Sequence, residues 1–331
     1  MAKCSICGKP AIAELRYARL RLCREHFIDF FTRKVEATIG KHGLFGEGER
    51  VLLAVSGGKD SASLASVLAG LAKKLGIEPI LFHIDLGLGK YSEEQRKAVE
   101  ALSQKTGLPL ILVRVRDILG GDGIPELARK SRRPECSVCG MVKRYLTNLA
   151  AIMVKADKVA LGHNLDDMLA YLLKNRIMGL EEYSSKLGPV SESIPGLLIA
   201  RARPLAEVYE RETLLYALAA GVPFTHEECP FRPRESIEDV NKEYVNKLED
   251  RTPGVKLRLF TTLLREARAP REGNGEKKPS KCRVCGAPAM GEECSFCKLT
   301  RRVYGEPLGP RARRVVEEAL RASGVLAPAS S

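Results

Sequence analysis

A short glycine-rich segment is the first place where residue type and spacing could do chemistry. Residues 56–61 read Ser-Gly-Gly-Lys-Asp-Ser, directly after the apolar run 51–55 and just before a helical pattern. The backbone N–H groups of such a loop and the N-terminus of the next helix converge on one point, which suits a phosphate. Close backbone approach, hydroxyl donors and a positive charge would come from Gly57, Gly58, Ser56, Ser61 and Lys59.

The spacing of this loop excludes a Walker-type ATPase. A Walker A loop needs a glycine at position 53 and Ser or Thr after the lysine, whereas this chain has Leu53 and Asp60. The alternative to a phosphate loop is a serine-capped helix after a tight turn. The agreement of strand, loop and helix favours the phosphate loop.

A second polar segment, 162–167 (Gly-His-Asn-Leu-Asp-Asp), follows the apolar run 158–161. Taken alone, it fits a helix N-cap whose acidic residues favour the helix dipole. Both polar segments follow apolar strand-like runs, so a parallel sheet would bring them to one edge.

Two sets of cysteines have the spacing of closed zinc sites. Each offers four ligands as two knuckles, with a glycine after the first knuckle for the tight turn (Gly8 and Gly286). Coincidental buried thiols are the alternative, and whether the modules bind RNA or only stabilise short segments stays open. The two sets are Cys4, Cys7, Cys23 and His26, and Cys282, Cys285, Cys294 and Cys297.

Three cysteines remain: the pair Cys136 and Cys139, and the solitary Cys229. They fit a redox pair with a bystander, an incomplete zinc site, or a 4Fe-4S cluster with one iron left open. The open iron could hold a sulfide. Lys143, on the helix expected after this knuckle, is placed to reach the same site as an oxyanion or phosphate partner.

The elements that must position these residues alternate along the chain. Apolar runs predict strands at 51–55, 80–84, 110–115, 158–161 and 197–203, with helical patterns at 60–75, 92–106, 143–156, 163–178 and 207–220. Strand–helix alternation is the signature of an α/β fold, a parallel sheet covered on both faces. Such sheets bind ligands at the carboxyl ends of their strands.

Composition limits the class of protein. A chain of 331 residues with 44% hydrophobic content can bury a core of ordinary size, and its net charge of +13 favours a polyanionic partner such as nucleic acid. Clusters of arginine and lysine at 129–133 and 301–314 are candidate phosphate contacts. We find no apolar run long enough to span a membrane and no signal-peptide pattern, and therefore expect a cytoplasmic protein.

Together these motifs resemble one family closely, the tRNA 2-thiouridine synthetases of the PP-loop ATPase superfamily. The resemblance rests on the first finger, Ser-Gly-Gly-Lys-Asp-Ser, Cys-Ser-x-Cys-Gly before Lys143, Gly-His-Asn-Leu-Asp-Asp, Glu-Glu-Cys-Pro at 227–230 and the last finger. The Glu-Glu-Cys-Pro segment and Arg-Pro-Leu (203–205) are similar to the branch that thiolates T-loop 5-methyluridine. One departure is Met168, where the family motif often has Glu.

The resemblance implies a PP-loop fold, like the adenine nucleotide alpha hydrolases, and a set of site residues. Cys136, Cys139 and Cys229 would hold the 4Fe-4S cluster, and Lys143, Asp167 and Asp60 would be catalytic. The implied ATP-binding residues are Ala54, Ser56, Gly57, Gly58, Lys59, Asp60, Ser61, His83, Ile84, Lys143, Gly162 and Asp167.

The implied reaction is ATP-dependent thiolation of tRNA. The enzyme would adenylate the 2-oxygen of 5-methyluridine 54 with MgATP and replace that oxygen with cluster-held sulfur. The implied partners are tRNA and a ubiquitin-like sulfur carrier with a C-terminal thiocarboxylate, and a homodimer stays open. Three alternatives remain, namely a wobble-uridine thiolase, a non-thiolating PP-loop ligase and a zinc-finger RNA-binding protein.

On this interpretation the chain divides into six segments. They are an N-terminal zinc finger at 1–30, a helical connector at 31–48, the PP-loop catalytic domain at 49–268, a linker at 269–280, a C-terminal zinc finger at 281–300 and a basic tail at 301–331.

Overall fold

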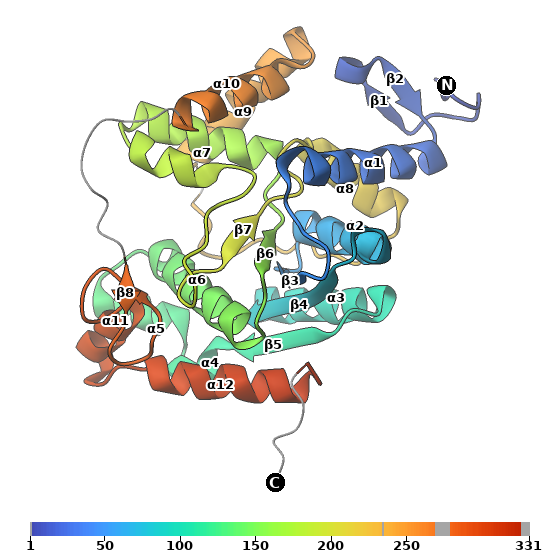
Figure 1. Ribbon diagram of the computed structural model, residues 1–331. Coiled ribbons are helices and arrows are strands. Elements are labelled where there is room, and N and C mark those ends of the chain that lie inside the picture. The colour runs from blue at the N-terminus through green and yellow to red at the C-terminus, as the bar shows by residue number, and fades with distance from the viewer. Residues whose placement is uncertain (1, 234, 269–278, 326–331) are drawn as a thin grey trace.

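Five parallel strands form the central sheet in the computed structural model, which describes residues 2–233, 235–268 and 279–325 (Figure 1). The strand order is β5-β4-β3-β6-β7. Most of the expected linker, up to residue 278, and the last six residues of the expected tail lie outside the described residues. The strands are β3 (Arg50–Ala54), β4 (Glu78–Asp85), β5 (Leu110–Arg114), β6 (Lys158–Leu161) and β7 (Ala200–Ala202).

Side chains alternate between the two faces of this sheet, and each face has its own core. Leu52 of β3 packs in one cluster with Phe82 and Val113, whereas its neighbour Leu53 packs in the other with Leu81. Both faces are therefore buried, as expected for parallel strands with continuous apolar runs. The expected α/β fold with helices on both faces is confirmed.

One face is covered by an N-terminal group of helices and the other by a group that includes the C-terminal segment. The first group is α1 (Arg24–His42), α2 (Lys59–Leu75), α3 (Lys90–Thr106) and α8 (Glu210–Ala219). The second is α4 (Val115–Leu119), α5 (Ile124–Ser131), α6 (Glu135–Met153), α11 (Ser295–Tyr304) and α12 (Gly309–Ala322).

A third, smaller core lies beyond the end of the sheet. It is formed by α7 (Leu165–Ile177), α9 (Ile237–Arg251) and α10 (Val255–Arg268), with the short helix η2 (Glu181–Leu187) beside them. The sequence patterns did not predict α9 or α10. These two helices follow the Cys229 segment and return the chain to the carboxyl edge of the sheet, next to α7.

Two expected elements differ from the structure. The strand expected at 197–203 is only the three-residue β7, because residues 194–198 form a turn in which Leu197 and Leu198 donate to the carbonyl of Ile194. The helix expected at 143–156 begins at Glu135, with the N–H groups of Ser137 and Val138 donating to Pro134. Cys136 and Cys139 therefore lie on the helix that carries Lys143, not before it.

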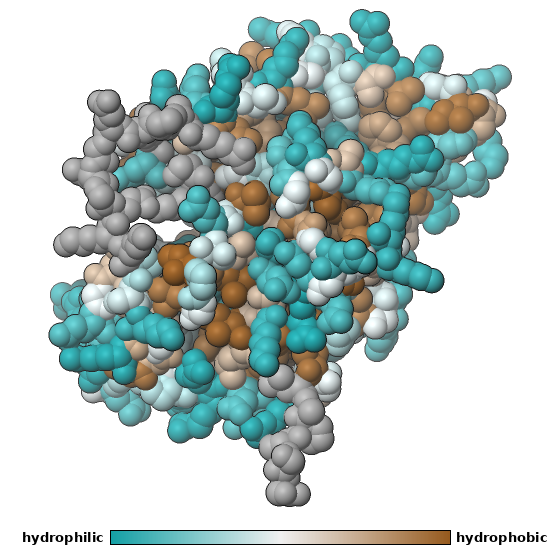
Figure 2. Space-filling model, viewed as in Figure 1, coloured by the Kyte–Doolittle hydropathy of each residue, from teal (hydrophilic) through white to brown (hydrophobic). Residues whose placement is uncertain are grey.

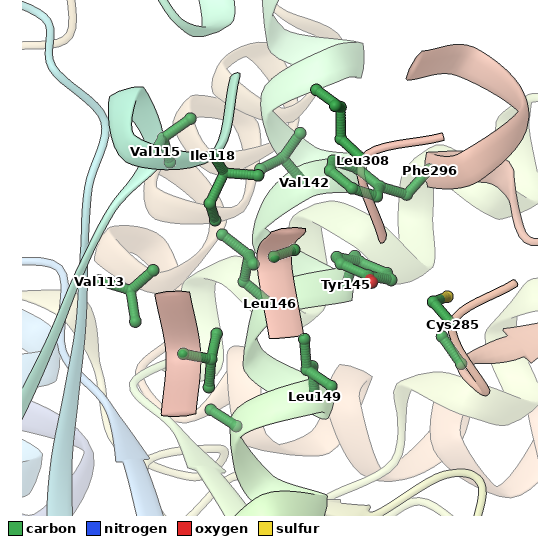
Figure 3. Packing of buried hydrophobic residues seen from close by; sticks show 14 of the residues in the cluster. Val113, Val115, Ile118, Val142, Tyr145, Leu146, Leu149, Cys285, Phe296 and Leu308 are labelled. Atoms are coloured by element: carbon green, nitrogen blue, oxygen red, sulfur yellow. The ribbon is translucent and has the colours of Figure 1, made fainter. Parts of the chain in front are cut away.

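The segment expected to be a basic tail is largely folded against the sheet. It forms helix α12, in which Ala312, Val316 and Leu320 are fully buried. Figure 3 shows α6 side chains packed among residues of α4 and the C-terminal segment, including Tyr145, Leu146, Ile118, Phe296 and Leu308. The arginines of α12 occupy the other side of an amphipathic helix.

Hydrophilic residues cover most of the face seen in Figure 2, and hydrophobic ones show mainly toward its middle and over the N-terminal module. In that module a hairpin of β1 (Ala13–Leu15) and β2 (Leu20–Leu22), joined by η1 (Arg16–Ala18), leaves Ile6 and Ile12 exposed nearby. Over the described ranges, no helix is both long and apolar enough to cross a membrane.

Candidate nucleotide and metal sites

The segment 56–61 forms a tight loop between β3 and α2. The Ser61 hydroxyl accepts from the N–H of Ser56 at 3.1 Å and donates to the carbonyl of Gly58 at 3.1 Å, which closes the loop. Gly57 has a φ of +91°, and a Cβ there would lie 2.9 Å from the Cα of Gln95. A side chain at position 57 would therefore disrupt both the backbone and the contact with α3.

The second polar segment lies against this loop. A Cβ on Gly162 would lie 2.8 Å from the backbone N of Ser61, so β6 can end here only with glycine. Asn164 and Asp167 form a reciprocal capping box at the start of α7, and the Asn164 amide donates to Asp60 at 3.2 Å. The two motifs thus meet at one edge of the sheet, as the sequence predicted.

Acidic and basic side chains from four helices form a network around this junction. Lys59 contacts Asp60 and Glu210, each at 2.8 Å, and Lys242 of α9 pairs with both Asp167 and Glu210. Burial acts to raise the pKa of Glu210, but the charges of Lys242 and Lys59 outweigh it and lower the pKa to about 2. Asp167 and Lys59 therefore already have counter-ions.

A cavity of about 660 Å³ opens beside the loop. One wall is apolar and runs along the ends of the central strands, with Ala54, Phe82, Ile84 and Leu86. The polar lining comes from α2, α6, β7 and the 162–167 segment. Its size and its mixed lining match those of ordinary small-molecule sites.

The structure places most, but not all, of the expected ATP-binding residues on the cavity wall. Ala54, Ser56, Asp60, Ser61, Ile84, Lys143 and Gly162 line it. Gly57, Gly58, Lys59 and Asp167 lie in the adjoining loop and cap and do not line it. His83 is buried behind the loop, where its Nδ1 lies 2.9 Å from the carbonyl oxygen of Val55. Met168, which stands where the family motif often has Glu, also lines the cavity. Besides Asp60 and Asp167, the loop network contains the carboxylate of Glu210, which pairs with Lys59 and Lys242.

Four cationic side chains also line the cavity, and we call them its cationic wall: Lys143, Arg144, Arg201 and Arg203. Burial, together with the charge of the neighbouring Arg201, lowers the pKa of Arg203 to about 10. Burial, aided by these arginines, also lowers the pKa of His163 to about 4, so that ring is neutral at pH 7. Within the described ranges, no carboxylate pairs with any of the four cations.

The three remaining thiols come together at the start of α6. Cys136 and Cys139 lie on its first turns, and the Cys136 thiol donates to the carbonyl of Phe231, two residues beyond Cys229, at 3.1 Å. Burial raises the pKa of Cys139, while a contact with Lys143 opposes the rise. Positions 136, 139 and 143 share one face of the helix, and Cys139 contacts Lys143, which lines the cavity.

The two outer cysteine sets are compact clusters. In each set the four ligand atoms all lie within 4.8 Å of one another. Cys7 and Cys23 are 3.7 Å apart at sulfur, as are Cys285 and Cys294. Sulfurs bound to one tetrahedral zinc are separated by about 3.8 Å, so both sets fit that ion. Cys136, Cys139 and Cys229, all among the described residues, are not gathered this closely.

Two models of known protein families match stretches of this chain. A model described as a PP-loop domain matches residues 29–230, more than half of the chain. A second model, described as the N-terminal LIM domain of 2-thiouridine synthetase TtuA, matches residues 3–28. The chain belongs to the PP-loop tRNA sulfurtransferases. The resemblance inferred from the sequence motifs is thereby confirmed.

Relatives of this sulfurtransferase cover nearly its whole length. The tRNA-5-methyluridine(54) 2-sulfurtransferase of Thermus thermophilus is 40% identical over 91% of this chain and 92% of its own. That of Pyrococcus horikoshii is 40% identical over 90% and 93%. The solved U34-tRNA thiolase NcsA from Methanococcus maripaludis, which has a 4Fe-4S cluster, superposes with a TM-score of 0.76 at 26% identity, covering 92% and 96%.

Sequence patterns did not reveal several residues of the sulfurtransferase site. Glu210 and Lys242 belong to helices whose position relative to the loop depends on the tertiary fold. Arg201 of β7 and Arg203, just after it, alternate with the buried Ala200 and Ala202, a period-two pattern that could have indicated a cationic strand face. Only the Arg-Pro-Leu segment drew attention to Arg203, and it carried no prediction of a cavity wall.

Proposed function

We propose that this sulfurtransferase uses MgATP to activate the 2-oxygen of 5-methyluridine 54 in tRNA and exchanges that oxygen for sulfur. The position is supported by the names of the Thermus and Pyrococcus relatives. NcsA, whose name indicates U34, is less similar in sequence and supports a wobble-uridine thiolase as the alternative. The observation that carries the proposal is a single cavity bordered by the phosphate loop and by Lys143 next to the three thiols.

The donor set at the start of α6 fits a 4Fe-4S cluster better than a single zinc ion. A cubane binds its thiolates through different irons, so they stand farther apart than around one tetrahedral ion, as these three do. Cys136, Cys139 and Cys229 would hold it. With three protein thiolates, such a cluster supplies an iron that can bind sulfide. The two compact outer sets would each hold Zn²⁺.

Different residues of this chain would bind the ATP phosphates, stabilise the charge that develops during adenylation, and orient Mg²⁺. Amides of the loop 56–61, with the hydroxyls of Ser56 and Ser61, would bind the phosphates at the N-terminus of α2. Lys143 would stabilise the charge that builds on the α-phosphate and the uracil oxygen. Asp60 and Asp167 would orient Mg²⁺, for which Asp167 must exchange its contact with Lys242 for the metal. His83 would support the loop through Val55.

The partners follow from the same proposal. The target base must leave its stack to bring its 2-oxygen to the α-phosphate. A ubiquitin-like carrier with a C-terminal thiocarboxylate would supply the sulfur. The reaction would take place in the cytoplasm, a location supported by the name of the bovine relative, cytoplasmic tRNA 2-thiolation protein 1. A homodimer is compatible with this reaction, and the fingers would either contact the tRNA or stabilise their own segments.

Mass spectrometry of tRNA nucleosides tests the reaction. Unmodified and 5-methyluridine-54 tRNA would be incubated anaerobically with the reconstituted enzyme, ATP and sulfide. We expect 5-methyl-2-thiouridine and tRNA-dependent release of pyrophosphate. A product of 2-thiouridine at the wobble position would overturn the choice of nucleotide, and no thiolated product with either tRNA would overturn the function.

Iron and acid-labile sulfide analysis tests the cluster separately. Cys229→Ala should remove the iron and the thiolation activity but leave ATP binding unchanged. Ser137→Ala, an exposed position between two of the proposed ligands, is the matched control and should retain both iron and activity. Recovery of zinc alone after anaerobic reconstitution of the wild-type protein would exclude the cluster.

A further inference from the structure

The cationic wall of the cavity is larger than the phosphate loop requires. Resting on the proposed function, we infer that Arg201 and Arg144 form a second anion subsite, which binds a phosphodiester of the RNA next to the nucleotide being modified. The ligand is thus a polynucleotide phosphate and not the triphosphate of ATP. The inference rests on the placement of these two arginines, on their missing counter-ions, and on the buried Arg203 next to Arg201.

The fold aims these arginines at the cavity. Ala200 and Ala202 of β7 are buried, and Ala202 packs in the core on the α1–α8 side of the sheet. Arg201 and Arg203 alternate with them and therefore face the opposite side, where α6 lies. There Arg144 of α6 and Arg201 both line the cavity, and the charge of Arg144 contributes to lowering the pKa of Arg201, after burial.

These charges are costly to hold together without an anion. Arg203 is 5% exposed; one of its terminal nitrogens donates to the carbonyl of Gly188 at 2.6 Å, while its Nε is buried with no partner. Neither Arg144 nor Arg201 has a carboxylate partner anywhere in the part of the chain that the structure describes. An unpaired cation is less stable the more deeply it is buried, so a bound anion would stabilise Arg203 and Arg201 more than the exposed Arg144.

The position of the wall favours RNA over ATP. β7 is the edge strand beyond β6, two strand spacings or roughly 10 Å from β3, which leads into the phosphate loop. The triphosphate has its own donors at that loop. Tyr171 of α7, 39% exposed, also lines the cavity and contacts His163 edge-on, so an aromatic face lies near the arginines. Cations next to an aromatic ring are typical of sites for unstacked nucleotides.

Binding and kinetics of arginine variants separate the two phosphate sources. We would prepare Arg201→Met and Arg144→Met, with Arg33→Met on the exposed side of α1 as the control and Arg201→Lys as the charge-conserving variant. The affinity for tRNA should fall about tenfold in each methionine variant, with the KM for ATP unchanged. The salt dependence of tRNA binding should weaken by about one counter-ion per arginine lost. Arg201→Lys should recover part of the affinity.

Each other outcome contradicts the inference. A higher KM for ATP with unchanged tRNA affinity would assign the wall to ATP phosphates, and no change in either would show that it binds no anion. Arg144 is exposed, so its variant keeps the test available if Arg201→Met does not fold. tRNA binding is measured without turnover. If the proposed thiolation is not observed, the effect of the arginine variants on tRNA affinity can therefore still be interpreted.

Discussion

At the scale of single residues, Gly162 lies where strand β6 meets the start of α2, and the backbone there leaves no room for a side chain. A Cβ there would lie 2.8 Å from two backbone atoms of Ser61. Gly162→Ala should therefore push the loop 56–61 away from the 162–167 segment. Because displacements near 1 Å can cost about 100-fold in a catalytic site, we expect ATP affinity, measured by calorimetry, to fall at least tenfold.

The control for this prediction is Gly40→Ala. Gly40 lies inside α1, has nothing within 4 Å of an added Cβ, and should gain about 0.5–1 kcal/mol of stability with no effect on ATP binding. If Gly162→Ala keeps wild-type ATP affinity, the loop 56–61 and the 162–167 segment do not need to be in close contact for ATP to bind.

Residues whose role depends on neighbours in sequence were the predictable ones. The loop 56–61, the two finger sets and the 162–167 cap each act through local spacing, so their chemistry could be inferred before any fold was known. Glu210, Lys242 and Arg201 act through contacts with residues more than 30 positions away. Charge at one position says nothing about its distant partner, so sequence patterns could not have identified Glu210 or Lys242. For Arg201, only the alternation with buried alanines was available as a signal.

At the scale of elements, a buried ion pair joins α1 to α8. Lys34 lies 2.7 Å from Glu212, and its ammonium also lies over the rings of Tyr17 and Tyr209. Both partners are largely buried, so Glu212→Ala leaves a buried ammonium without its counter-ion. We expect the free energy of unfolding, measured in urea, to fall by about 3–5 kcal/mol.

An exposed pair on the same helix provides the comparison. Arg33 and Asp29 are 3.0 Å apart on the solvent side of α1, and Asp29→Ala should change stability by no more than about 0.5 kcal/mol. Similar small losses in both variants would mean that water reaches Lys34 in the folded protein and that the pair does not hold α1 in place.

Element boundaries were predictable where apolar periodicity continued and uncertain where it stopped. Helix α6 begins eight residues before its expected start. The predicted start was too late because Cys136 and Cys139 interrupt the apolar pattern in a segment whose backbone is helical. Helices α9 and α10 carry few buried residues of their own and depend on α7 for their core. Leu257, Phe260, Leu264 and Ala267 of α10 nevertheless recur at helical spacing, so the sequence did carry a signal for this helix.

At the scale of the whole molecule, the C-terminal set of four cysteines packs against α6, the helix that carries two of the proposed iron–sulfur ligands. Tyr145 of α6 stacks on Phe296 with ring centroids 4.3 Å apart. A Cβ on Gly309, at the start of α12, would lie 2.6 Å from the Cys297 sulfur. Cys282, Cys285, Cys294 and Cys297 thus belong to the same hydrophobic core as α6. Loss of metal from these four cysteines should therefore displace α6 and, with it, the α6 side chains that line the cavity.

Cys297→Ala and Cys7→Ala would measure this dependence, because each removes one ligand from a different outer set. Metal binding at a structural site contributes directly to folding, so Cys297→Ala should lower the free energy of unfolding by roughly 3 kcal/mol or more. It should also reduce the iron bound after reconstitution, since α6 carries Cys136 and Cys139. Cys7 is exposed in the N-terminal module, which packs beside α1 and not against α6, so its variant should lose zinc but keep its iron. Equal loss of iron in both variants would show that the effect is not transmitted through α6.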